Sequence, residues 1–193
     1  MKNEVQGQRV IEFDQCSVDG NVIPFVESLH PADASTRNNQ LGSQPGLILD
    51  VGCGDLPRGN VNVDRFVKRS IHRSSDLNPK KIPNFILADS RYLPFRNACF
   101  RKVVSYQTIE HVPTPELMLY EMVRVSTRRV LVVCPHRLKF NIHALGYKGH
   151  INKFGNQWFK KMFEMLHCRL IRNDVRSGLL GIPEDIVVKA EKL

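Results

Sequence analysis

The sequence predicts an α/β fold whose sheet has seven strands, mostly parallel, and ends in an antiparallel hairpin. Three observations lead to this prediction. Short apolar runs alternate with segments of helical periodicity from residue 47 onward, a pattern typical of parallel sheets with helices on both faces. The first run, at 47–52, ends in glycine, as a buried parallel strand does at a turn. The last two runs have only a short connection, which favours antiparallel pairing because parallel strands need a long crossover.

Apolar runs mark the expected strands, which lie at 47–52, 61–64, 84–89, 101–107, 128–135, 168–177 and 185–193. Two helices are expected, at 115–126 and 155–167. Pro115 suits the first turn of the first helix, whose apolar positions recur at roughly helical spacing: Leu117, Leu119, Met122, Val123 and Val125. The second helix is amphipathic, and its apolar side is formed by Trp158, Phe159, Met162, Phe163 and Leu166.

The N-terminal part of the chain is less patterned than the rest. Residues 31–46 are polar and rich in turn formers, which predicts a loop or linker, and the stretch before them favours short strands or one helical turn. We therefore expect an N-terminal extension or cap over 1–46 and a single domain over 47–193.

Composition and charge narrow the class of protein. The formal net charge of +9 favours a polyanionic partner such as RNA, or else reflects only a solvated basic surface. No apolar run approaches the roughly 18–20 residues that span a bilayer, and the start of the sequence has no apolar signal segment. The five cysteines are scattered without a CxxC pair, which suits a reducing compartment. We expect a cytoplasmic protein with no membrane partner.

A glycine pair and an acid define the candidate binding site. Gly52 and Gly54 flank Cys53 where the first strand ends, and glycine allows positive φ and close approach of a ligand to the backbone. Asp64 ends the second strand, and ligands of open α/β sheets bind beyond such carboxyl ends. Because a carboxylate can accept both hydroxyls of a ribose, these residues indicate a nucleoside cofactor.

Two common nucleotide-binding motifs are excluded. The chain contains no GxxxxGK[ST] phosphate-binding loop. The dinucleotide fingerprint needs a third glycine where this chain has Pro57, and its acid stands about 20 residues on, whereas Asp64 follows Gly54 after ten. A cofactor without phosphates does not need the helix dipole that this fingerprint supplies.

Several segments, in the right order, resemble the class I S-adenosylmethionine-dependent methyltransferases, especially the ubiquinone/menaquinone-biosynthesis-like group called type 11. They are "LDVGCG" at 49–54, "VNVD" at 61–64, "ADSRYLPF" at 88–95, "SYQTIEHV" at 105–112 and "GHINKF" at 149–154. The resemblance implies a Rossmann-like fold and S-adenosylmethionine as the cofactor. Residues 55–60 are too few for the family's usual first helix, so we expect this helix to be shortened or absent.

The resemblance also implies which residues bind the cofactor. Asp64 matches the acid that binds the ribose, Asp89 and Ser90 lie beside the adenine, and Gln107 and Thr108 face the methionine end. Arg58 is a candidate to hold the methionine carboxylate. The full predicted set is Asp50, Gly52, Cys53, Gly54, Asp64, Arg65, Asp89, Ser90, Gln107 and Thr108.

Histidines are the candidate catalytic residues. Methyl transfer releases a neutral leaving group, so the protein mainly positions the reactants and sometimes adds a base. We name His111 and His143 as candidate bases, with His136 and His150 as further candidates, because histidine titrates near pH 6.5. The alternative for each is an ordinary loop histidine. No metal site is expected, because the cysteines lack ligand spacing.

The sequence thus predicts an S-adenosylmethionine-dependent methyltransferase whose acceptor is an unidentified small molecule or RNA. No [DN]-P-P-[YFW] motif follows the fourth strand, which disfavours methylation of exocyclic nitrogen by that route. Cys134-Pro135 has the reverse order of the Pro-Cys motif of pyrimidine C5 methylation. The alternative is a methyltransferase-like subunit without activity of its own that binds the cofactor or a protein partner.

Overall fold

The computed structural model describes residues 46–69, 75–138, 150–178, 181 and 183–193 in full, and the backbone of two short strands before them. These strands, β1 (Gln15–Val18) and β2 (Asn21–Pro24), pair antiparallel in a sheet of their own. Both fall within the expected N-terminal extension. The candidate base His143 lies outside the described residues.

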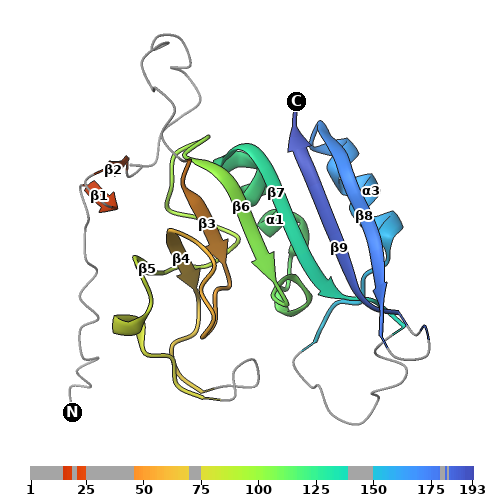
Figure 1. Ribbon diagram of the computed structural model, residues 1–193, viewed down its shortest axis with the longest axis horizontal. Coiled ribbons are helices and arrows are strands. Elements are labelled where there is room, and N and C mark those ends of the chain that lie inside the picture. Colours follow the sequence, from red (N-terminus) through yellow and green to blue (C-terminus); the bar gives the residue numbers. More distant parts are fainter. Residues whose placement is uncertain are drawn as a thin grey trace, which may run out of the picture.

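The main sheet has seven strands in the order β5-β4-β3-β6-β7-β9-β8 (Figure 1). Its members are β3 (Ile48–Val51), β4 (Val61–Asp64), β5 (Phe85–Leu87), β6 (Phe100–Tyr106), β7 (Ser126–Pro135), β8 (Cys168–Ser177) and β9 (Pro183–Lys192). The first five strands along the chain are parallel, and β9 runs antiparallel between β7 and β8. The predicted fold class, with its C-terminal antiparallel hairpin, is confirmed.

The strand order reverses at β3. The chain moves outward from β3 to β4 and β5, then returns to place β6 on the other side of β3. Asp50 on β3 is flanked by Asn62 on β4 and Val104 on β6, so the carboxyl ends of these strands meet at one edge. An open α/β sheet binds ligands at such a reversal.

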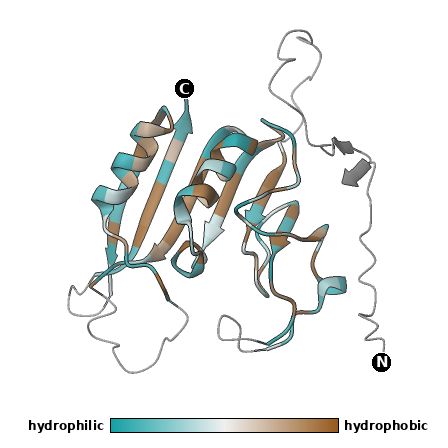
Figure 2. Ribbon diagram, turned by 180° about the vertical axis from the view of Figure 1, so that it is seen from behind, coloured by the Kyte–Doolittle hydropathy of each residue, from teal (hydrophilic) through white to brown (hydrophobic). Residues whose placement is uncertain are grey.

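Both α-helices of the described residues, α1 (Pro115–Val125) and α3 (Asn156–Met165), cover the same face of the sheet (Figures 1 and 2). The expectation of helices on both faces is wrong for this part of the chain. Residues 52–60 connect β3 to β4, shorter than the dozen or so residues of a usual helical crossover. The described residues between β4 and β5 hold only the 3₁₀ turn η1 (Pro79–Lys81).

The hydrophobic core lies between the sheet and these two helices. Val103, Val132 and Ile186 from the strands pack with Met122 of α1 and Phe159 of α3, and all five are completely buried. One predicted position is wrong: Leu117 is 41% exposed, and Met118 takes its place in the buried stripe of α1. Trp158 is only partly buried and packs against the core. Neither helix is long and apolar enough to serve as a bilayer span, nor is any other helix of the described residues.

A charged row crosses the other face of the sheet. Lys102, Arg129, Glu191 and Arg169 are cross-strand neighbours on β6, β7, β9 and β8. Glu191 forms ion pairs with Arg128, Arg129 and Arg169. This row places a cluster of basic side chains on a face that no described helix covers.

Candidate functional site

A cavity of about 510 Å³ lies at the carboxyl ends of β3, β4, β5 and β6. It occupies the point where the strand order reverses. All but one of the predicted cofactor residues line it: Gly52, Cys53, Gly54, Asp64, Arg65, Asp89, Ser90, Gln107 and Thr108. The predicted base His111 lines it as well.

The turn after β3 requires glycine. Gly52 has φ 76° and Gly54 has φ 56°, in the left-handed region that residues with a Cβ rarely adopt. A Cβ at Gly52 would stand 2.3 Å from the side-chain atoms of Thr108. The backbone N–H groups of Gly52 and Cys53 both donate to the carbonyl of Val63, at 2.8 and 3.0 Å. The turn is therefore fixed between the ends of β4 and β6.

Asp64 connects this turn to the end of β4. Its Oδ2 accepts from the backbone N–H of Gly54 at 3.0 Å, and its Oδ1 accepts from the N–H of Phe66 at 2.9 Å. A carboxylate offers about four acceptor positions, more than these two bonds take. The same side chain can hold the glycine turn and accept hydrogen bonds from a ligand in the cavity.

Asp50 is the predicted cofactor residue that does not line the cavity. It lies inside β3, is completely buried, and accepts a hydrogen bond from the backbone N–H of Arg58 at 2.8 Å. Burial raises the pKa of its carboxyl to about 6. Arg58 lines the cavity, and its guanidinium lies 4.2 Å from the centroid of the Tyr106 ring. Asp50 thus acts beneath the site by positioning Arg58.

Asp89 is held by two arginines at the end of β5. Arg91 donates to both carboxylate oxygens, at 3.0 and 2.7 Å, and the guanidinium of Arg65 lies 3.4 Å away. The hydrogen bonds from Arg91 hold the pKa of Asp89 below its ordinary value. The carboxylate is therefore ionised and fixed in orientation, with Arg65 and Asp89 both facing the cavity.

Gln107 and Thr108 follow β6. Gln107 has φ 50°, and its Nε2 donates to Asp185 on β9 at 3.2 Å. The hydroxyl of Thr108 lies 2.9 Å from the carbonyl of Tyr106 and 3.3 Å from that of Gly52. Positive φ at a glutamine is uncommon and costs energy, so this turn is imposed by its surroundings.

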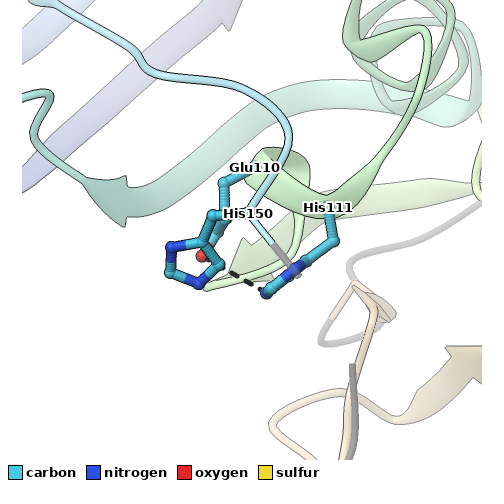
Figure 3. A group of neighbouring side chains, drawn as sticks. All are labelled: Glu110, His111 and His150. Carbon is cyan, nitrogen blue, oxygen red and sulfur yellow. Dashed lines mark ion pairs between the residues drawn. The ribbon is translucent and has the colours of Figure 1, made fainter. Parts of the chain in front are cut away.

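A histidine cluster lies beside the cavity (Figure 3). The 3₁₀ turn η2 (Ile109–His111) carries Glu110, which is completely buried, and His111. Nε2 of His111 lies 3.9 Å from a carboxylate oxygen of Glu110. The ring of His150 stands edge to face with that of His111, at 4.5 Å between centroids.

The four candidate histidines differ in position. His111 lines the cavity, and the ring of His150 contacts the ring of His111. His136 does not line the cavity. His136 is buried, which lowers its pKa, and its Nδ1 accepts from the N–H of Leu138. These features indicate a structural role for His136.

Other residues that the prediction did not include also line the cavity, namely Asp55, Leu56, Val63, Phe66, Ala88, Tyr106, Val112, Pro113 and Ile151. Several stand next to predicted residues, such as Tyr106 before Gln107 and Ala88 before Asp89. Ile151 comes from the distant segment 149–154, which resembles the same family but was given no cofactor residue. Cys53 is buried and packs with Leu77 and Ile82.

The chain resembles known methyltransferases both in sequence and in fold. Residues 49–134 match a family described as "methyltransferase domain". The matched segment is similar to methyltransferase domains and spans less than half of the chain. A search of curated proteins finds no match.

Solved structures of methyltransferases share the fold of this chain, including its C-terminal strands. A methyltransferase from Thermotoga maritima is 15% identical, with 78% of this chain and 84% of that chain covered and a TM-score of 0.56. One from Mesorhizobium loti is 10% identical, with coverages of 76% and 91% and a TM-score of 0.56. Magnesium protoporphyrin IX methyltransferase from Synechocystis, with bound SAH, is 16% identical, with coverages of 77% and 74% and a TM-score of 0.54. The predicted class I methyltransferase fold is confirmed.

Proposed function

We propose that this protein transfers the methyl group of S-adenosylmethionine and binds that cofactor in the cavity at the ends of β3 to β6. One observation carries the proposal: every predicted cofactor residue except Asp50 lines this single cavity. Its volume falls within the range of about 300–1,000 Å³ that is usual for small-molecule sites. The methyltransferase-domain match and a structural neighbour crystallised with SAH support the choice of cofactor.

Each part of the cofactor has a partner in the cavity. Asp64 accepts the ribose hydroxyls while it holds the glycine turn. Phe66 and Asp89 flank the adenine, and the guanidinium of Arg58 pairs with the methionine carboxylate. Gln107 lies at the end of β6 and faces the sulfonium. From the adenine to the sulfonium, these proposed contacts lie along the strand ends from β5 across β4 and β3 to β6.

The reaction is a displacement at the methyl carbon. The acceptor forms a bond to this carbon, the carbon–sulfur bond breaks, and its electron pair stays on sulfur as a neutral thioether. The protein accelerates this step mainly by holding both reactants in line. His111 lines the cavity and is the proposed base for an acceptor that must lose a proton.

Calorimetry with S-adenosylmethionine and SAH tests cofactor binding directly. We expect one site per chain. A radiolabelled methyl donor, incubated with the protein and fractionated cell extract, then shows whether label enters RNA, protein or small metabolites. Binding without transfer to any fraction would favour the alternative of a non-catalytic subunit that binds the cofactor or a protein partner. Absence of binding would overturn the proposal.

RNA is the second candidate acceptor. It is supported by the net charge of +9 and by the basic side chains of the charged row on β6, β7 and β8. RNA binding through phosphates weakens steeply as salt rises. Affinity for RNA that does not change between low and physiological salt would remove this candidate.

We also propose a reducing compartment, the cytoplasm. The cysteines of the described residues, Cys53, Cys99, Cys134 and Cys168, are all free. Burial raises the pKa of the thiols of Cys99, Cys134 and Cys168, which makes them poor nucleophiles. Location of a fluorescent fusion in cells tests this expectation.

A further inference from the structure

We propose that Glu110, His111 and His150 bind a divalent transition metal of the zinc type beside the cavity, with one coordination position open toward it. The sequence predicted no metal site, because its cysteines lack ligand spacing. Two imidazoles and one carboxylate form instead the ligand set of many zinc sites that keep a fourth position for water or substrate. Imidazole nitrogens also favour zinc, cobalt and nickel over magnesium and calcium.

The distances fit a small metal ion. One ligand atom from each of the three side chains lies within 4.8 Å of the other two. Zinc binds histidine nitrogen and carboxylate oxygen at about 2.0–2.2 Å, which places tetrahedral ligand atoms about 3.5 Å apart. The separation of 3.9 Å between Glu110 Oε1 and His111 Nε2 is already close to this value. The three side chains stand next to one another in Figure 3.

The backbone holds the two contributing segments together. The carbonyl of Glu110 accepts hydrogen bonds from the N–H groups of Ile151 and Asn152, both at 3.0 Å. The side-chain amide of Asn152 donates to the carbonyl of Val112 at 2.6 Å. These bonds fix His150 relative to η2 without any metal. A preorganised ligand set binds a metal more tightly than one that must be ordered.

The proposed ligands differ in how exposed they are to the cavity. Glu110 is completely buried, whereas the side chain of His111 is 21% exposed and lines the cavity. A buried carboxylate gains from a cation placed next to it. His111 is the one proposed ligand that lines the cavity, so a metal bound to it would be reached from the cavity side.

The site suggests a class of acceptor, and this step rests on the proposed function. An acceptor that enters the cavity at His111 can place a hydroxyl or carboxylate oxygen on the metal. With His111 bound to the metal, it would no longer act as the base. A metal-bound hydroxyl would instead lose its proton to solvent, and its oxygen would then attack the methyl carbon of the cofactor. Methyl acceptors with an oxygen nucleophile thus fit this site.

Cobalt is the probe for the metal site, because its visible spectrum reports coordination by nitrogen and oxygen. The full-length protein, stripped with chelator and free of cofactor, is titrated with Co²⁺. We expect one tightly bound ion per chain with a four-coordinate spectrum. His150→Ala and Glu110→Gln should each weaken binding by about tenfold or more. His167→Asn is the matched control, because it removes an exposed histidine outside the cluster and asparagine tolerates its φ of 52°.

Added azide tests the open position, and we expect it to shift the cobalt spectrum. Thermal melting of each stripped variant checks that it is folded. The proposal is overturned if the wild type binds no stoichiometric cobalt, or if both folded variants bind it as the wild type does. An unshifted spectrum with azide would overturn the open position. None of these measurements uses S-adenosylmethionine, so failure of the metal site and failure of the proposed function are separate outcomes.

Discussion

The carboxylate of Asp64 accepts a hydrogen bond from the backbone N–H of Gly54 at 3.0 Å. The acid at the end of β4 and the glycine turn after β3 are thereby parts of one rigid unit. A ligand that binds Asp64 also meets a turn whose geometry is already set. Loss of the carboxylate should therefore affect both the ligand and the turn.

Asp64→Ala should weaken binding of S-adenosylmethionine by about 100-fold or more. Hydrogen bonds to a charged group contribute about 1.5–3 kcal/mol each, and the variant removes those to the ribose together with the support of Gly54. Calorimetry measures the change. Asp174→Ala is the control, because Asp174 is an exposed acid on β8 that pairs with the nearby Arg172. Equal affinity in the two variants would remove Asp64 from the site.

Gly52→Ala should destabilise the fold by about 1–3 kcal/mol and abolish cofactor binding. The added methyl group meets both an unfavourable φ and the side chain of Thr108. Urea unfolding measures the stability. Gly181→Ala is a matched control, since Gly181 has φ 71° but no atom within 4 Å of the new Cβ. If both variants lose the same free energy of unfolding, the positive φ alone accounts for the loss and the contact with Thr108 adds nothing to it.

Asp50 should make the protein less stable as pH rises. Its folded pKa of about 6 lies above the ordinary value of 3.8, so the native state binds the proton more tightly than the unfolded chain does. This contribution to stability is complete below about pH 4 and is lost as pH rises through about 6. The loss amounts to roughly 3 kcal/mol at most.

Asp50→Asn tests this dependence, because it removes the charge but keeps an acceptor for Arg58. Its stability relative to wild type should increase between pH 4.5 and about 7, as urea unfolding at each pH can measure. Asp76→Asn is the control. Hydrogen bonds from Arg69 and Lys68 lower the pKa of Asp76, so its stability difference from wild type should stay constant between pH 4.5 and about 7 and shrink only below about pH 4. A stability difference for Asp50→Asn that stays constant with pH would contradict the raised pKa.

Glu121→Ala should destabilise the protein without changing cofactor affinity. Glu121 is buried on α1, forms an ion pair with Arg124 at 2.6 Å, and accepts from the N–H of Leu93 at 2.7 Å. Breaking a buried pair costs about 3–5 kcal/mol. Urea unfolding and calorimetry measure the two effects. A large loss of affinity at full stability would show that this network acts on the site instead.

The sequence predicted the strands well because each strand is a short, local apolar pattern. It predicted most of the cavity for the same reason, since each motif ends a strand and parallel strands end at one edge. Asp50 was misplaced because a motif does not tell which of its residues points into a buried layer. The one-sided arrangement of α1 and α3 depends on connection lengths, which periodicity does not reveal.

The contact between Glu110 and His150 could not be predicted from local pattern. These residues are 40 positions apart, and the bonds that join them run from the backbone of Ile151 and Asn152 to the carbonyl of Glu110. Hydrogen bonds between the backbones of irregular segments cannot be recognised from composition or from the spacing of residues along the sequence. His111 could be predicted because it follows β6 directly, whereas its neighbours in space come from another part of the chain.

The direct connection from β3 to β4 has a consequence for the motion of the cavity. The amides of Gly52 and Cys53 share the carbonyl of Val63 as acceptor, so neither can exchange its hydrogen while the two strands stay together. The side of the cavity formed by the glycine turn can then open only if β3 and β4 separate. Slow hydrogen exchange at these glycine-turn amides, even without a ligand, would show that the cavity is preformed and does not close around the ligand.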